Sequence, residues 1–426
     1  MDYARRIIDD MLDQAFPHLA AIALEGAKGV GKTATGMQRA NTVVNLADAA
    51  ERSLIARNVG HISQVDPPVL IDEWQLIPEV WDTVKTAVDR NGAGGRFLLA
   101  GSAGLKPGVR VHSGAGRIVR LKMRPLSLAE RGVAEPTVSL ASLLEGGQAA
   151  LSGESPLGLG DYVEEILRSG FPGVRGLPDL PRNLQLDSYL ARIVDSELPE
   201  NGVTVRHPDA LRRWLRAYGA ATSTDARFST ILAAATPGEP DKPARATVQG
   251  YREHLTRLFI LDPLDAWRPA FNPLSALTNT PKHHLVDPAL AARLVGVGRA
   301  GLLRGEGVRV GGARASGGTW LGALFESLAV QSVRVYAEAA NARVAHMRLA
   351  DSRREIDIIV EREDQSVVAI EVKLASDVND GDAKHLNWLK DQIGDRVIDR
   401  VILNTGSRAM RLQSGVAVVP LALLGP

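Results

Sequence analysis

Cysteine is absent from this chain of 426 residues. Its absence excludes disulfides, thiolate zinc sites and cysteine nucleophiles, so the fold must depend on packing. Long apolar runs are absent as well, because no segment approaches the roughly 20 residues that span a bilayer. The N-terminal segment carries Asp9, Asp10 and Asp13, whereas a signal peptide has an uncharged core. We therefore expect a cytoplasmic protein with no membrane partner.

An excess of charge of one sign is also missing. The formal net charge is +1, so no overall basic field indicates a nucleic-acid partner, and any DNA surface must be local. Aromatic residues make up only 4% of the chain, which disfavours stacking platforms for single strands. The 45% hydrophobic and 23% charged residues are typical of a soluble globular protein. At roughly 100–200 residues per domain, we expect several separate cores.

The first third of the chain alternates short apolar segments with helical patterns. An apolar segment at 19–24 is followed by a glycine-rich turn and then by a helical pattern at 33–40. Such alternation predicts a parallel sheet with helices on both faces. The remaining predicted elements of this part are strands at 42–46, 69–71, 97–100 and 118–121, and a helix at 80–88.

The glycine-rich turn fits the pattern G-x-x-x-x-G-K-[ST] in full. Glycines let successive backbone N–H groups point at phosphates, and the N-terminus of the next helix adds a favourable dipole. Lys32 is expected to reach the β and γ phosphates, and Thr33 to place its hydroxyl on Mg²⁺. A plain glycine-rich hairpin is the alternative, but it does not explain the flanking strand and helix. The predicted ATP-binding residues are Gly26, Ala27, Lys28, Gly29, Val30, Gly31, Lys32, Thr33 and Ala34.

Two carboxylates follow the apolar strand at 69–71. Asp72 and Glu73 stand where a parallel sheet opens to its ligand. We expect Asp72 to hold Mg²⁺ through water and Glu73 to polarise the attacking water. An acidic pair after a strand is by itself more often a solvated turn, but the complete phosphate loop favours the catalytic interpretation.

On these motifs, the first third of the chain resembles AAA+ ATPases. The resemblance implies that Ser102, after the strand at 97–100, is the sensor-1 polar residue, although many members of that family have asparagine there. It also implies that Arg117, before the strand at 118–121, is an arginine finger. Such a finger acts on a neighbouring subunit, so the resemblance predicts a homo-oligomer. An ordinary solvent-facing arginine is the alternative for Arg117.

The middle of the chain is predicted to be mostly helical. Helices at 211–221, 230–235 and 246–259 run into a strand at 259–261, which is the order of a helix-turn-helix with a wing. Both a DNA-binding role and a role as a lid stay open for this region. His283 and His284, followed by Asp287, are interpreted as solvated residues and not as a metal site. The glycine- and arginine-rich segment 304–318 is predicted to be a linker.

The last hundred residues carry a second set of acids. A helix at 321–337 precedes strands at 342–348, 355–360 and 367–372, then a helix at 383–393 and a strand at 401–403. Asp357, Glu371 and Lys373 lie on two adjacent strands, and side-chain alternation puts Glu371 and Lys373 on one face. Two carboxylates there can hold Mg²⁺, and the bound ion can activate water. The alternative is a weak surface pair.

This set resembles the PD-(D/E)-x-K nuclease superfamily. The resemblance implies that Glu326, on the preceding helix, is a further acid of a metal site with Asp357 and Glu371, beside Lys373. Whether such a domain cleaves DNA stays open, because a fold does not fix a function.

The whole layout resembles a group of bacterial and archaeal ATPases that join an AAA+ module, a winged-helix region and a nuclease-like domain. Segments 170–173 and 189–195 look like the middle of that group. We expect an α/β multidomain protein that couples Mg²⁺-dependent ATP hydrolysis to a DNA-directed C-terminal domain, with a motor or remodeller on branched or broken DNA as one expected role. An ATP-gated nuclease and a nucleotide-dependent switch are the alternatives. The expected domains are 1–135, 136–205 (a helical linker or lid), 206–303 and 317–426.

Overall fold

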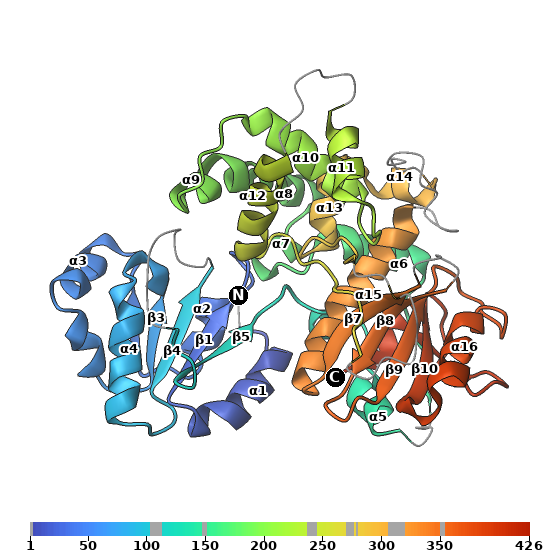
Figure 1. Ribbon diagram of the computed structural model, residues 1–426, viewed down its shortest axis with the longest axis horizontal. Helices are drawn as coiled ribbons and strands as arrows, with labels where there is room; N and C mark the ends of the chain where they lie inside the picture. The colour runs from blue at the N-terminus through green and yellow to red at the C-terminus, as the bar shows by residue number, and fades with distance from the viewer. Residues whose placement is uncertain are drawn as a thin grey trace.

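The computed structural model places three parts side by side. In Figure 1 the N-terminal α/β part is at the left, the C-terminal α/β part is at the right, and a helical region lies above them. The α/β multidomain class expected from the sequence is therefore found. The structure describes residues 3–102, 113–146, 151–236, 245–269, 277, 280–305, 320–349 and 354–426.

The N-terminal part is built on a five-stranded sheet in the order β2-β3-β4-β1-β5, and all neighbouring strands are parallel. The predicted parallel sheet is confirmed. Its elements are α1 (Ile7–Ala15), β1 (Ala21–Glu25), α2 (Lys32–Met37), β2 (Thr42–Asn45), α3 (Ala49–Arg57), β3 (Val69–Asp72), α4 (Glu79–Arg90), β4 (Phe97–Gly101) and β5 (Ile118–Lys122).

Side-chain alternation along these strands builds a core on each face of the sheet. Ile22 and Leu24 of β1 pack on the face that α1 covers, through Leu12. Ala21 and Ala23 face the other way, into a cluster that contains Trp81 of α4 and buried residues of β3 and β4. Helices therefore lie on both faces, and the carboxyl ends of all five strands meet at one edge.

The helical region packs around one central helix, α13, whose first residues are buried. Helices from both sides of the expected boundary at 205/206 contact it, so the structure joins these two segments in one body. The predicted helices at 211–221, 230–235 and 246–259 are found. The elements are α6 (Leu159–Arg168), α7 (Pro172–Arg175), α8 (Asp179–Arg192), α9 (Leu198–Glu200), α10 (Pro208–Ala220), α11 (Phe228–Ala235), α12 (Arg245–Arg257), α13 (Pro288–Val295) and α14 (Arg299–Leu303).

The strand predicted at 259–261 is wrong as a regular element. Phe259 has a left-handed backbone with φ of 57°, which breaks an extended conformation. Only an isolated bridge pairs Leu261 with Leu285. The predicted linker at 304–318 lies almost wholly outside the described residues.

The C-terminal part is a mixed sheet in the order β11-β12-β10-β9-β8-β7, between α15 on one face and α16 on the other. Every helix and strand predicted here is found, although β10 begins four residues earlier than expected. Its elements are α15 (Trp320–Ala339), β7 (Arg343–Arg348), β8 (Glu355–Glu361), β9 (Val367–Val372), α16 (Lys384–Ile393), β10 (Val397–Asn404), β11 (Met410–Arg411) and β12 (Ala417–Pro420).

A segment distant in sequence completes this part. Helix α5 (Leu140–Glu145) packs against β9, β10 and α15, below the sheet in Figure 1. The short strand β6 (Val138–Ser139) just before it pairs in parallel with β13 (Leu424–Gly425). Part of the segment expected to be a helical linker therefore belongs structurally to the C-terminal body.

Candidate functional site

The turn between β1 and α2 has the backbone that a phosphate-binding loop needs. Gly29 and Gly31 have φ of 85° and 105°, in the left-handed region that favours glycine. A Cβ atom at Gly26 would lie 2.1 Å from the carbonyl oxygen of Met123. A residue with a side chain would therefore be strained at Gly29 and Gly31 and would clash at Gly26. The predicted loop from Gly26 to Ala34 fits a polyphosphate.

Lys32 begins α2 and lies inside the loop. Its Nζ donates hydrogen bonds to the carbonyl oxygens of Gly26 at 2.8 Å and Ala27 at 2.9 Å. Burial lowers the pKa of Lys32 to about 8, against the opposing effect of Glu73 and Asp72. The loop carbonyls thus hold the ammonium beside the amides that would surround a phosphate.

Thr33 and Asp72 meet as predicted at the carboxyl edge of the sheet. The Thr33 hydroxyl donates to both carboxylate oxygens of Asp72, at 2.9 and 3.0 Å. Burial raises the pKa of Asp72, and the hydrogen bond from Thr33 opposes that rise. A hydroxyl and a carboxylate at this spacing are oxygen ligands of the kind that Mg²⁺ prefers, so the pair fits a magnesium ion.

Glu73 and Ser102 also lie together at this edge. The Glu73 carboxylate accepts a hydrogen bond from Gln75 Nε2 and, at 3.4 Å, one from Ser102 Oγ. The Glu73 backbone is left-handed, with φ of 51°, which turns the chain sharply after β3. Ser102 therefore contacts the carboxylate expected to activate water. Gln75 was missed from the sequence because nothing in its spacing marked it.

Arg117 lies at the opposite edge of the sheet from the phosphate loop. β5 runs parallel to β1, with Ile118 beside Ala21 and Lys122 beside Glu25, so the residue before β5 is at the amino end. Its guanidinium pairs with Asp89 of α4 at 2.8 Å and is 47% exposed. This placement separates Arg117 from the loop of its own chain.

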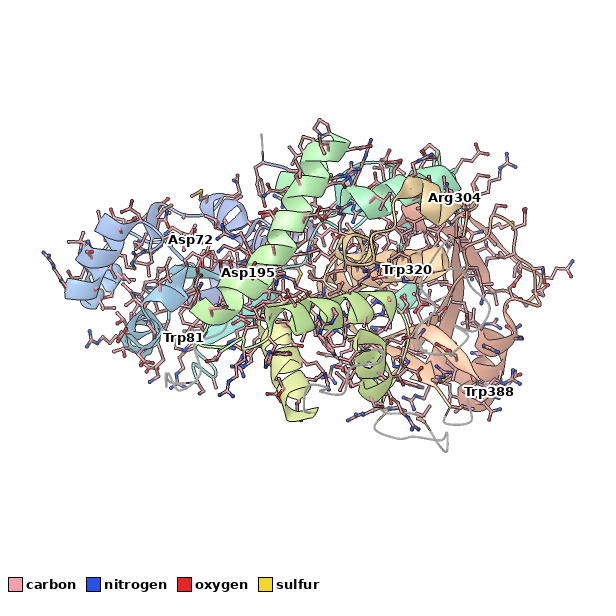
Figure 2. The ribbon with its side chains drawn as sticks, turned by 90° about the horizontal axis from the view of Figure 1, so that it is seen from above. Asp72, Trp81, Asp195, Arg304, Trp320 and Trp388 are labelled. Carbon is pink, nitrogen blue, oxygen red and sulfur yellow. The ribbon has the colours of Figure 1, made fainter. Side chains whose placement is uncertain are left out.

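Residues outside the expected motifs also surround the loop. Arg6 Nη1 donates to the Val30 carbonyl at 3.0 Å, and Lys28 pairs with Glu197 at 2.8 Å. Phe171 packs beside Gly29, within the segment 170–173 whose role the sequence left open. Figure 2 shows the long helix that precedes Asp195 ending beside the N-terminal part that carries Asp72. The helical region therefore touches the phosphate loop directly.

The acids of the C-terminal part meet a lysine. Lys282 Nζ lies 2.8 Å from Glu326, 2.8 Å from Glu355 and 2.9 Å from Asp357. Burial acts to lower the pKa of Lys282, but the three carboxylates outweigh it and hold that pKa well above its usual value. Burial raises the pKa of Glu326 to about 8.

Glu371 pairs with Lys373 at 3.1 Å. Burial raises the pKa of Glu371, and the nearby Asp357 carboxylate adds to that rise, so Glu371 and Asp357 lie close together. The Lys282 ammonium contacts both Glu326 and Asp357, so two of the three predicted metal ligands are bonded to a protein cation. Among the described residues, no group of three or more histidine or carboxylate side chains is arranged to hold a metal.

The interpretation of His283 and His284 as solvated is wrong. Their side chains are 0% and 2% exposed. His283 Nε2 lies 2.7 Å from the Ala226 carbonyl, and burial lowers its pKa to about 4. Asp287 caps α13 and accepts a hydrogen bond from the Gly170 amide at 2.7 Å. These residues are structural, and they were misread because adjacent polar residues on an irregular segment are more often at the surface.

Three family models match separate parts of the chain. Residues 19–131 match a family described as an AAA domain. The N-terminal part is similar to AAA-type P-loop ATPases. Residues 159–300 match a family described as a Domain of unknown function (DUF8612), and residues 321–424 match a Domain of unknown function (DUF4143). No curated protein matches the chain.

The matched ranges agree with the bodies seen in the structure. The AAA match contains the whole phosphate loop, Asp72, Glu73, Ser102 and Arg117. The match at 159–300 crosses the boundary expected at 205/206, as the packing around α13 also does. In the part of the chain that the structure describes, no helix has the length and apolar character to cross a membrane.

Proposed function

We propose that this protein is a Mg²⁺-dependent ATPase that couples ATP binding and hydrolysis to its helical region and C-terminal domain. The contact between the Thr33 hydroxyl and the Asp72 carboxylate carries the proposal. It places two oxygen ligands of the kind that Mg²⁺ prefers beside a loop whose glycines and lysine suit a triphosphate. The similarity of residues 19–131 to an AAA domain supports the same activity.

Each residue of the site has a distinct task in this proposal. The loop amides and the Lys32 ammonium bind the phosphates and stabilise the charge that builds on them. Thr33 and Asp72 would hold Mg²⁺, which supplies further charge neutralisation when bound. Glu73 orients the attacking water and accepts its proton. Gln75 and Ser102 hold the Glu73 carboxylate in place through their hydrogen bonds.

The contacts of the loop suggest how its occupancy reaches the rest of the chain. Lys28 and Phe171 join the loop to the helical region. Behind them, buried Arg131 bonds Glu165 of α6 and, at 3.2 Å, Gln331 of α15. A triphosphate draws Lys28 toward its own charge, which weakens the pair with Glu197. We propose that the loss of the Lys28–Glu197 pair transmits nucleotide binding to the helical region.

The test of the ATPase is steady-state phosphate release by the purified full-length chain. Wild type is expected to release phosphate from ATP in the presence of Mg²⁺, and Lys32→Ala is expected not to. Equal, background-level release by both chains refutes the proposal. Turnover per subunit that rises with protein concentration supports a homo-oligomer in which Arg117 acts on a neighbour's nucleotide.

We further propose DNA, including branched or broken DNA, as the partner of the helical region. Its support is the order of α10, α11 and α12, followed by the bridge between Leu261 and Leu285, which resembles a helix-turn-helix with a wing. Arginines are exposed on α10 and α12, at Arg213 and Arg257. Phosphate release is measured with duplex, single-stranded and branched DNA. If no DNA changes it and none binds, the DNA partner is refuted while the ATPase stands.

A further inference from the structure

A buried lysine lies in the acidic cluster of the C-terminal part. The Lys282 side chain is only 1% exposed and contacts Glu326, Glu355 and Asp357 at 2.8 to 2.9 Å. These acids come from α15 and β8, while the lysine comes from the helical region. A charge buried this deeply must be paired, and three carboxylates pair it.

The backbone holds Lys282 in that position. Its N–H donates to the Leu264 carbonyl, and its own carbonyl accepts from the Leu264 amide, both at 2.9 Å. The segment that contains Leu264 continues to the edge of the C-terminal sheet, where the Trp267 amide donates to the His346 carbonyl of β7 at 2.7 Å. The His346 amide donates back to Asp265 at 2.9 Å. Lys282 is therefore held by backbone pairing to Leu264, whose own segment extends the sheet beyond β7.

Hydrogen bonds already occupy both oxygens of Asp357, whereas the buried Oε1 of the nearby Glu371 accepts none and has His385 at 3.6 Å. One oxygen of Asp357 accepts from Lys282, and the other accepts from the Val372 amide at 2.9 Å. Glu326 also accepts from the lysine at 2.8 Å. A divalent ion bound to the same carboxylates would stand within a few ångströms of the ammonium, and like charges repel strongly in a buried site. The ammonium already supplies one positive charge at the position between Glu326 and Asp357.

We propose that Lys282 is a built-in cation that takes the place of a divalent metal in this cluster. As a consequence, the C-terminal domain does not bind a catalytic metal at Asp357 and is not a nuclease that depends on a metal there. The lysine also fixes the helical region to the C-terminal sheet. This inference goes beyond the proposed ATPase and does not depend on it, because none of these residues touches the phosphate loop.

The test counts bound Mn²⁺ by paramagnetic resonance on the full-length chain without nucleotide. Wild type, Lys282→Met and Lys282→Arg are each compared with the same chain carrying Asp357→Asn, so that metal bound elsewhere cancels. Methionine removes the charge and keeps much of the side-chain volume, while arginine keeps the charge. We expect Lys282→Met alone to gain a Mn²⁺ site that Asp357→Asn abolishes.

Three results overturn the proposal. The first is a Mn²⁺ site in wild type that Asp357→Asn removes. The second is a folded Lys282→Met chain that gains no site, and the third is a gained site that survives Asp357→Asn. If Lys282→Met does not fold, thermal unfolding of wild type and Asp357→Asn with and without Mn²⁺ decides. An equal shift of the unfolding temperature by Mn²⁺ in both chains supports the proposal, and a rise of that temperature in wild type alone refutes it.

Discussion

The Thr33 hydroxyl lies 2.9 Å from a carboxylate oxygen of Asp72, although 39 positions separate the two residues in sequence. Three parallel strands, β1, β4 and β3, produce this contact by ending at the same edge of the sheet. The contact links the start of the helix behind the phosphate loop to the strand that carries the acidic pair.

Removing either the phosphate-binding lysine or the carboxylate that would hold magnesium should strongly reduce ATP hydrolysis. Lys32→Ala removes the buried ammonium, and Asp72→Asn removes the charge beside Thr33. Each should lower turnover by roughly a hundredfold or more, because charge stabilisation at the phosphates is lost. Steady-state phosphate release measures the effect. Lys384→Ala, at an exposed position of α16, is the control and should behave as wild type.

Glu73→Gln should separate binding from hydrolysis. The amide keeps the shape of the side chain but cannot accept a proton, so turnover should fall by about 10²–10⁴ while ATP still binds. Equilibrium binding of a fluorescent ATP analogue, beside phosphate release, distinguishes the two steps. Wild-type turnover by Glu73→Gln would remove Glu73 from the reaction.

Gln75 should act as a positioning residue for Glu73. Gln75→Ala removes the hydrogen bond to the Glu73 carboxylate but no group expected to contact phosphate. The expected result is a smaller loss in kcat than for Glu73→Gln, with little change in KM. A change confined to KM would assign Gln75 to substrate binding instead.

The sequence predicts the parts of this site that lie close together along the chain. Gly29 and Gly31 are dictated by the backbone that the loop needs, and Asp72 follows directly from the apolar strand before it. Both signals are local, so spacing alone identifies them. The parallel sheet follows from the same alternation of strands and helices.

Contacts between distant segments could not be read in this way. Glu197 is 169 positions from Lys28, and Lys282 is 75 positions from Asp357. Only the packing of whole domains brings such pairs together, and no periodic pattern records it. The acids at Glu326 and Asp357 were recognisable as a set, but the lysine between them was not, because its neighbours His283 and His284 suggested an exposed loop.

ATP affinity should fall as the pH rises through about 8, the value to which burial lowers the pKa of Lys32. A triphosphate beside the ammonium favours its charged form, so the pKa of Lys32 rises in the complex. Above that pH the free protein has lost the proton, and binding must take one up. Calorimetric titrations in buffers of different ionisation enthalpy should detect this uptake. Lys32→Ala should not show it.

Asp262 should be a major source of stability where the parts meet. It is buried and pairs with Lys122, Arg124 and Arg334 at 2.6 to 2.9 Å. Asp262→Asn leaves those cations without their counter-charge and should cost about 3–5 kcal/mol in the free energy of unfolding. Denaturant unfolding measures it. Asp395→Asn, at an exposed carboxylate, should change stability by less than about 0.5 kcal/mol.

The pH dependence of this effect has a definite sign. Burial acts to raise the pKa of Asp262, but the three cations outweigh burial and hold that pKa well below its usual value. A carboxyl with a lowered pKa in the folded state stabilises the protein above its unfolded-state pKa, and this contribution is lost as the pH falls through its folded-state pKa. The stability difference between wild type and Asp262→Asn should therefore shrink in acid. A difference that is constant with pH would contradict the charge-based explanation.

Arg117 should matter for hydrolysis only between subunits. It precedes β5, at the edge of the sheet opposite the phosphate loop, so it cannot contact the nucleotide of its own chain without a large movement. Arg117→Ala should lower turnover at protein concentrations where subunits associate and leave the slower turnover of dilute protein unchanged. Arg90→Ala, at an exposed neighbouring arginine of α4, is the matched control.

Mixing Arg117→Ala with Lys32→Ala decides whether Arg117 acts in trans. If it does, the Arg117→Ala chain supplies an intact phosphate loop and the Lys32→Ala chain supplies the arginine. Recovery of turnover in the mixture supports the finger, whereas equal loss at all concentrations without recovery assigns Arg117, with Asp89, a structural role.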